Sequence, residues 1–326
     1  MKRLLIDDRL RDLAKEYKKA LAKKFTAKPT KKLEDLKSQL DSVDFAEERI
    51  YIQHIIDNYE SIILLEPEKF DKFQEDFFNV GDVRKPVIKK VKDRKTQKTR
   101  NEEKKLHERI VECMRYEDIR TNIYPLLFPK LNLHTCPYCN AQYLDVVERK
   151  AGERGNFQID HAYPKSKYPW LCTTFFNMVP SCGSCNLAKH ADAPVYNLYT
   201  NDYSKLYPFH FRLETKSLLK YLLTQDEKKL EIKLNTTEAG LDNYEQAFSI
   251  ESLYSAYNDV VEEIIWKAQI YNESFKANLE ESLGRLFPYC GDFTRFIVGN
   301  YTEPKDILKR PLALLMGDIA RQLKLI

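Results

Sequence analysis

Four cysteines at two matched spacings are the clearest chemical feature of this chain. Cys136 and Cys139 are separated by two residues, and so are Cys182 and Cys185. This spacing lets both thiolates of a pair reach one ion, and two such pairs complete the tetrahedral shell that zinc prefers. Because four thiolates leave no coordination position open, we expect a structural rather than a catalytic zinc. Four unrelated buried cysteines are the alternative, which the matched spacings disfavour.

Three further cysteines, Cys113, Cys172 and Cys290, have no partner at ligand spacing. We expect them to be small buried residues, which is a common environment for a free cysteine. His134 lies just before the first cysteine pair and is an additional nearby donor, although four cysteines already complete the shell.

An acid and an imidazole stand side by side between the two cysteine pairs. Residues 157–159 predict a short strand that leads into Asp160 and His161. An aspartate is a hard oxygen ligand suited to Mg²⁺ or Mn²⁺, and a histidine is a good base near neutral pH. Because neighbouring strand residues point to opposite faces, both side chains reach one site only at a strand end or bend. Alone, the dipeptide is weak evidence of function.

Two asparagines strengthen that evidence. Asn177 follows the Asp-His pair, and Asn186 comes directly after the last ligand cysteine. The order of CPYC, DH, Asn177, CGSCN and Lys189 resembles the HNH endonuclease family over residues 136–189. The resemblance implies a ββα-metal fold with a pair of zinc knuckles. It also implies hydrolysis of phosphodiester bonds of nucleic acid, which we expect to be DNA, with catalytic Mg²⁺ or Mn²⁺.

The resemblance also implies a role for each residue. Asp160 and Asn186 would bind the catalytic divalent metal, and His161 would be the general base that activates water. Asn177 would orient the ring of His161. The last position of the motif is Asn rather than His in this sequence, and His190 is the alternative candidate for its role.

Three lysines near the motif are candidate contacts to the nucleic-acid backbone. Lys165 and Lys167 follow the Asp-His pair, and Lys189 lies one helical turn after Cys185. Cations at such positions bind phosphates without reading sequence. A solvated side chain is the alternative for Lys189.

A narrower resemblance concerns the run DHAYPKSKYPWL followed by CGSCNLAK. It is similar to the HNH subunits of Septu and retron-type anti-phage systems. This similarity implies an effector of bacterial antiviral defence that works with an ABC/SMC-like ATPase partner. The alternative is a non-catalytic zinc-ribbon module or scaffold subunit that binds nucleic acid without cutting it.

The rest of the chain must position this motif. Residues 1–105 predict a helical N-terminal arm, ending in a basic linker at 84–105 that holds eleven Lys or Arg and three acids. We expect that linker to be exposed and partly flexible, either as solvated surface or as a phosphate contact. Residues 106–200 would form the nuclease core, beginning with one helix at 106–128. Residues 201–326 predict a mainly helical region with a short β-hairpin.

Composition fits a mainly α protein with a small α+β core between helical arms. The chain has 326 residues, 43% of them hydrophobic, and a net charge of +4. Because the basic linker alone carries +8, the remainder sums to −4, so we expect the arms to bind a partner protein rather than nucleic acid. No apolar run spans a membrane and no signal peptide is evident, so we expect a cytoplasmic protein without membrane contact.

Overall fold

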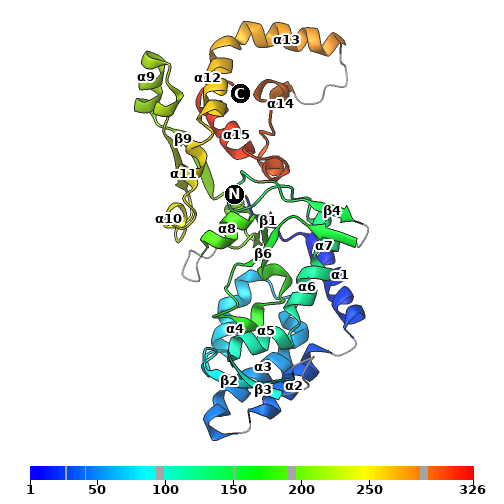
Figure 1. Ribbon diagram of the computed structural model, residues 1–326. Helices are drawn as coiled ribbons and strands as arrows, with labels where there is room; N and C mark the ends of the chain where they lie inside the picture. The colour runs from blue at the N-terminus through cyan, green and yellow to red at the C-terminus, as the bar shows by residue number, and fades with distance from the viewer. Residues whose placement is uncertain (26–27, 41, 93–98, 150–151, 190–195, 287–292) are drawn as a thin grey trace.

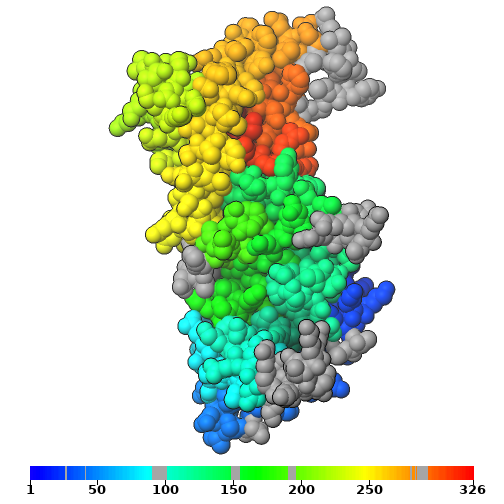
Figure 2. All heavy atoms as spheres, viewed as in Figure 1, coloured from blue at the N-terminus to red at the C-terminus, as the bar shows by residue number. Residues whose placement is uncertain are grey.

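The computed structural model describes residues 1–326 except 26–27, 41, 93–98, 150–151, 190–195 and 287–292. The chain is mainly helical, and its described strands form small two-stranded sheets. Figure 1 shows the N-terminal helices at one end, the C-terminal helices at the other and the motif region between them. In Figure 2 the motif region, in green, fills the middle of the molecule.

The N-terminal arm is helical, as its apolar spacing predicts. The first of its helices begins after Asp7, whose carboxylate accepts a hydrogen bond from the Leu10 N–H at 2.8 Å and so caps the free amides. Its buried residues recur at three- and four-residue intervals along one face. The elements are β1 (Leu4–Leu5), α1 (Asp8–Lys24), α2 (Pro29–Gln39), α3 (Ala46–Ile62) and α4 (Phe70–Phe77).

The basic segment 84–105, which we expected to be exposed and partly flexible, contains two strands among its described residues. Its described residues form an antiparallel pair, β2 (Pro86–Lys92) and β3 (Thr99–Lys105). Two of its lysines, Lys89 and Lys104, bind the carboxylate of Glu112 from either strand. The carboxylate that pairs with these two lysines therefore lies outside the segment, on the helix that follows it.

The middle of the chain is divided more finely than predicted. One helix was expected over 106–128, but Arg115 adopts a left-handed conformation with φ of 60° and ends the first helical piece. The elements that follow are α5 (Leu106–Cys113), α6 (Tyr116–Asn122), α7 (Tyr124–Leu127), β4 (Val146–Arg149), β5 (Gly152–Gly155), β6 (Gln158–His161), β7 (Met178–Ser181) and α8 (Gly183–Ala188). β6 and β7 are antiparallel, and α8 begins directly after them.

The C-terminal region combines helices with one strand pair. β9 (Phe209–Leu213) and β10 (Ile232–Thr236) pair antiparallel within 201–326, where a short β-hairpin was predicted, with a helix rather than a tight turn between them. β8 (Tyr199–Thr200) pairs parallel with β1 and so joins the chain start to the motif region. The helices are α9 (Thr215–Thr224), α10 (Tyr244–Phe248), α11 (Ile250–Ser255), α12 (Asn258–Ile270), α13 (Glu273–Leu286), α14 (Phe293–Val298) and α15 (Ala313–Gln322).

A buried asparagine joins the C-terminal region to the first cysteine pair. Asn140 has a left-handed backbone, and its Nδ2 donates to the Ile307 carbonyl at 2.9 Å. Its Oδ1 accepts from the Leu314 N–H at 3.0 Å, and its own carbonyl accepts from the Leu312 N–H at 2.7 Å. One residue thus satisfies backbone groups at the start of α15.

We predict that Asn140→Ala lowers the free energy of unfolding by about 2–4 kcal/mol, because it strands two buried backbone groups and strains a left-handed position. Urea unfolding followed by circular dichroism would measure this change. Asn235→Ala, at an exposed position of β10, is the control and should change little. Equal stability of the two variants would contradict the assigned role.

Candidate metal sites

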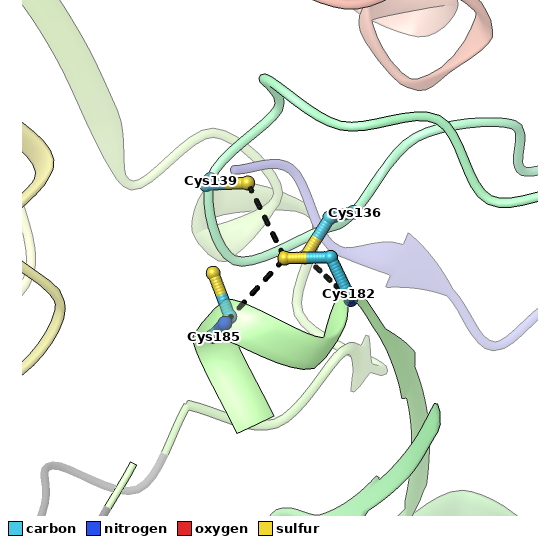
Figure 3. Close-up of side chains that lie close together, drawn as sticks. All are labelled: Cys136, Cys139, Cys182 and Cys185. Carbon is cyan, nitrogen blue, oxygen red and sulfur yellow. Dashed lines mark hydrogen bonds between the residues drawn. The ribbon is translucent and has the colours of Figure 1, made fainter. Parts of the chain in front are cut away.

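The four predicted zinc ligands come together. The Sγ atoms of Cys136, Cys139, Cys182 and Cys185 all lie within 4.8 Å of one another, and all four residues are buried (Figure 3). The first two lie in the loop before β4, Cys182 follows β7, and Cys185 is in the first turn of α8. Four soft sulfur donors in one small cluster fit a zinc ion with a closed tetrahedral shell.

Backbone amides turn toward these sulfur atoms. The Cys182 N–H lies 3.4 Å from the Cys136 Sγ, and the Ala141 N–H lies 3.4 Å from the Cys139 Sγ. Hydrogen bonding among the four thiols lowers the pKa of Cys182 and Cys139 and raises that of Cys185, and burial raises the pKa of Cys136. Donors of this kind favour the thiolate, which is the form that binds metal.

The other sulfur and imidazole candidates lie apart from the cluster. Cys113 and Cys172 are buried, as expected for cysteines without ligand spacing. His134 is exposed. Cys290 and His190 fall outside the described residues, so the alternative role of His190 stays a prediction.

Asp160 and His161 occupy the last two positions of β6, opposite Val179 and Met178 of β7. Although strand neighbours face opposite ways, both residues line one hollow of about 340 Å³. Asp160 and His161 thus lie at a strand end, where two neighbouring residues can share one site. Asn186 of α8 lines the same hollow, so three of the four predicted catalytic residues meet there.

One side-chain oxygen of Asp160 is held by neighbours and the other is not. Its Oδ2 accepts hydrogen bonds from the Tyr138 hydroxyl at 2.5 Å and from the Lys189 Nζ at 2.7 Å. The Nδ2 of Asn186 donates to the Gln158 Oε1 at 2.5 Å. Within the described part of the chain, the Oδ1 atoms of Asp160 and Asn186 have no hydrogen-bond partner. Two uncommitted oxygens on one hollow fit a hard divalent cation.

His161 is a buried, neutral imidazole. The residue is only 4% exposed, and its ring centroid lies 4.8 Å from that of Tyr116. Burial lowers its pKa from 6.5 to about 4. Its Nε2 lies 2.9 Å from the carbonyl oxygen of Cys172, and a carbonyl only accepts, so Nε2 carries the proton. The Nδ1 atom therefore keeps a lone pair and can take up a proton.

Asn177 does not hold the ring of His161 as the resemblance implied. Its fully buried side chain accepts from the Tyr163 N–H at 2.8 Å and donates to the carbonyls of Tyr163 and Leu171, both at 3.1 Å. It thereby closes the loop that follows β6. The carbonyl of Cys172, at the end of that loop, orients the ring of His161. Asn177 therefore affects the ring only indirectly, by fixing the loop.

The three predicted phosphate-binding lysines have three different environments. Lys165 is exposed, lines the hollow and lies 4.5 Å above the Tyr116 ring. Lys167 lines a separate hollow with Gln74 and Gly81. The side chain of Lys189 is only 5% exposed and is paired with Asp160, so it is neither solvated nor turned toward a phosphate.

The sequence argument missed the residues that α6 contributes. Tyr116 and Arg120 line the same hollow, about forty residues before Asp160 and His161 in sequence. No local spacing connects them to the motif. Tyr138 was also missed, although its place between two ligand cysteines was a usable signal.

Comparisons with protein-family models, with curated proteins and with solved structures found no match to this chain. Among the described helices, none has both the length and the apolar character needed to cross a membrane. The four-cysteine cluster is thus the feature on which a metal-binding assignment rests.

We predict about one zinc per chain in the purified protein, and loss of that zinc together with cooperative unfolding in Cys182→Ser. Structural zinc sites are worth roughly 10–16 kcal/mol in apparent binding free energy, which is comparable to the stability of a whole domain. Elemental analysis and thermal unfolding would measure both effects. Cys113→Ser, which removes a buried cysteine outside the cluster, should keep its zinc. Folded, unchelated protein without zinc would refute the four-ligand assignment.

Proposed function

We propose that this chain is a metal-dependent endonuclease of the HNH type that hydrolyses phosphodiester bonds, with DNA as its substrate. The observation that carries the proposal is the meeting of Asp160, His161 and Asn186 at one hollow beside the cysteine cluster. The succession of two antiparallel strands and a helix, β6, β7 and α8, supports the ββα-metal core that the resemblance implies.

In this proposal Asp160 and Asn186 would hold the divalent cation through their side-chain oxygens. A bound Mg²⁺ or Mn²⁺ would neutralise charge on the scissile phosphate and on the leaving 3′ oxygen. The Nδ1 atom of His161 takes the proton of the attacking water, a contribution worth roughly 10²–10⁴-fold in rate. The Cys172 carbonyl keeps the other nitrogen protonated, and so holds the basic tautomer ready.

Cations at the rim would receive the nucleic-acid backbone. Lys165 is exposed at the hollow, and Arg120 lies across from it on α6. Arg120 is half exposed and pairs with Glu117 at 2.7 Å, and exposed pairs of this kind contribute only about 0–1 kcal/mol. A phosphate can therefore exchange with that partner at little cost.

The alternative function is a zinc-ribbon module or scaffold that binds nucleic acid without cutting it. Such a module has no use for an acid and a neutral imidazole at one hollow. Two uncommitted side-chain oxygens there are likewise unnecessary for binding phosphates, which require donors and positive charge. The site chemistry therefore favours the enzyme.

We further propose that the protein is an effector of bacterial anti-phage defence controlled by an ABC/SMC-like ATPase. Support comes from the narrower resemblance and from apolar side chains exposed on the C-terminal arm. Leu219 and Leu223 of α9 are 57% and 87% exposed, and Trp266 and Ile270 of α12 are 47% and 60% exposed. A hydrogen bond of 2.9 Å from the Trp266 Nε1 to the Tyr221 hydroxyl joins these helices. Exposed apolar helix faces are typical of protein interfaces.

We predict that wild-type protein with Mg²⁺ or Mn²⁺ nicks plasmid DNA and that His161→Ala lowers the rate at least 100-fold, since it removes the base. Gel assays of nicked plasmid, with RNA as a second substrate, would measure this. Because the pKa of His161 is lowered to about 4, the base stays neutral and the rate should persist well below pH 6.5. His134→Ala, an exposed histidine away from the hollow, is the control. Cleavage by His161→Ala at the wild-type rate would remove the assignment.

We predict that Leu223→Glu and Trp266→Glu together weaken co-purification with the ATPase partner without lowering cleavage by the isolated chain. A charge on either side chain cannot be buried cheaply at an apolar interface. Affinity purification after co-expression with candidate ATPases would measure the effect. Tyr203→Glu, which alters an exposed aromatic outside these two helices, is the matched control. Partner binding that survives the double substitution would reject this surface.

A further inference from the structure

The ammonium group of Lys189 is surrounded by four oxygen atoms. Its Nζ is 2.7 Å from the Asp160 Oδ2, 2.6 Å from the His161 carbonyl, 3.3 Å from the Ala162 carbonyl and 3.5 Å from the Tyr138 hydroxyl. The side chain is only 5% exposed. An ammonium group surrounded in this way is fixed, because each of its bonds would have to be broken for it to reach a phosphate in solvent.

We propose that Lys189 and Tyr138 are positioning residues that orient the carboxylate of Asp160 for a divalent cation. This inference rests on the proposed function. Both side chains donate to the same oxygen of Asp160, Oδ2. Binding on one oxygen fixes the carboxylate plane and leaves Oδ1 for the cation. Partners of this kind orient metal ligands in many sites.

The two donors come from opposite halves of the cysteine cluster. Tyr138 stands between Cys136 and Cys139, and its ring is held by stacking on Phe248 at 5.0 Å. Lys189 ends α8, where its N–H donates to the carbonyl of Cys185 at 3.0 Å. The cysteine cluster therefore sets the direction of the Asp160 carboxylate through one side chain from each pair.

A competing role for Lys189 makes the opposite prediction. An ammonium group repels a divalent cation, so a lysine that merely occupied the cation's place would weaken its binding. Removing such a lysine would tighten the binding of Mn²⁺. Removing a positioning lysine would weaken it. Tyr138 carries no charge, so only positioning predicts that loss of its hydroxyl matters.

The experiment is a titration of Mn²⁺ into the zinc-loaded full chain. Calorimetry and electron paramagnetic resonance measure the binding of Mn²⁺. Lys189→Met and Tyr138→Phe should each weaken Mn²⁺ binding, by roughly 10–100-fold for loss of such a partner. Lys85→Met is the matched control, because Lys85 pairs with the buried Glu48 and neither residue lines the hollow. It should bind Mn²⁺ like the wild type.

Each outcome has one meaning. Unchanged or tighter binding in both variants, with wild-type binding and cleavage intact, overturns the positioning role and leaves the proposed function standing. A wild type that neither binds Mn²⁺ nor cuts DNA overturns both. If Lys189→Met fails to fold, Tyr138→Phe decides alone, since it removes a single hydroxyl and keeps the stacked ring.

Discussion

The cluster of four cysteine sulfurs is the constraint on which the rest of the motif region depends. It joins a loop at residues 136–139 to the β7–α8 junction, which lies more than forty residues later. The α8 helix has six residues and is too short to be stable by itself. Two of the four sulfurs fix its first turn, and so fix Asn186 and Lys189. Asp160 lies on the strand paired with β7, where it pairs with Lys189 and lines the same hollow as Asn186.

The two arms complete the site from outside the motif. Hydroxyls of Tyr244 and Tyr254 donate to the carbonyls of Tyr138 and Cys139, each at 2.6 Å, so the C-terminal region satisfies the first knuckle's backbone. On the other side, Trp170 of the loop after β6 stacks on aromatic residues of the N-terminal arm and donates to Gln74 at 2.8 Å. Buried backbone groups and rings thus make both arms part of the support of the site.

Sequence reasoning succeeded where a pattern is local. Two-residue spacing predicted the cysteine cluster, and helical periodicity predicted the N-terminal helices. It failed where the partner of a residue lies far along the chain. Glu112 binds Lys89 and Lys104 of the two strands in segment 84–105, and Asp160 pairs with the buried side chain of Lys189. Asn177 looked like a partner of His161, but its hydrogen bonds close a loop, which spacing alone cannot distinguish.

Buried polar residues gather around the candidate site, and the side chains of Asn140, His161 and Asn177 are hydrogen-bonded, whereas the hydroxyls of Thr173, Thr174 and Ser181 have no partner among the described residues. Seven of the sixteen buried polar or charged residues described lie between positions 135 and 181. Apolar side chains of similar shape would pack there at no greater cost, because a buried polar group contributes little net stability even when it is fully bonded. What a bonded Asn177 or His161 adds is direction, since each hydrogen bond fixes an angle as well as a distance. Catalytic groups must be held within about 0.5 Å of their working positions. In this part of the core, hydrogen-bonded side chains such as Asn177 and His161 therefore contribute more to fixing positions than to net stability, and the proposed catalytic role would need such fixed positions.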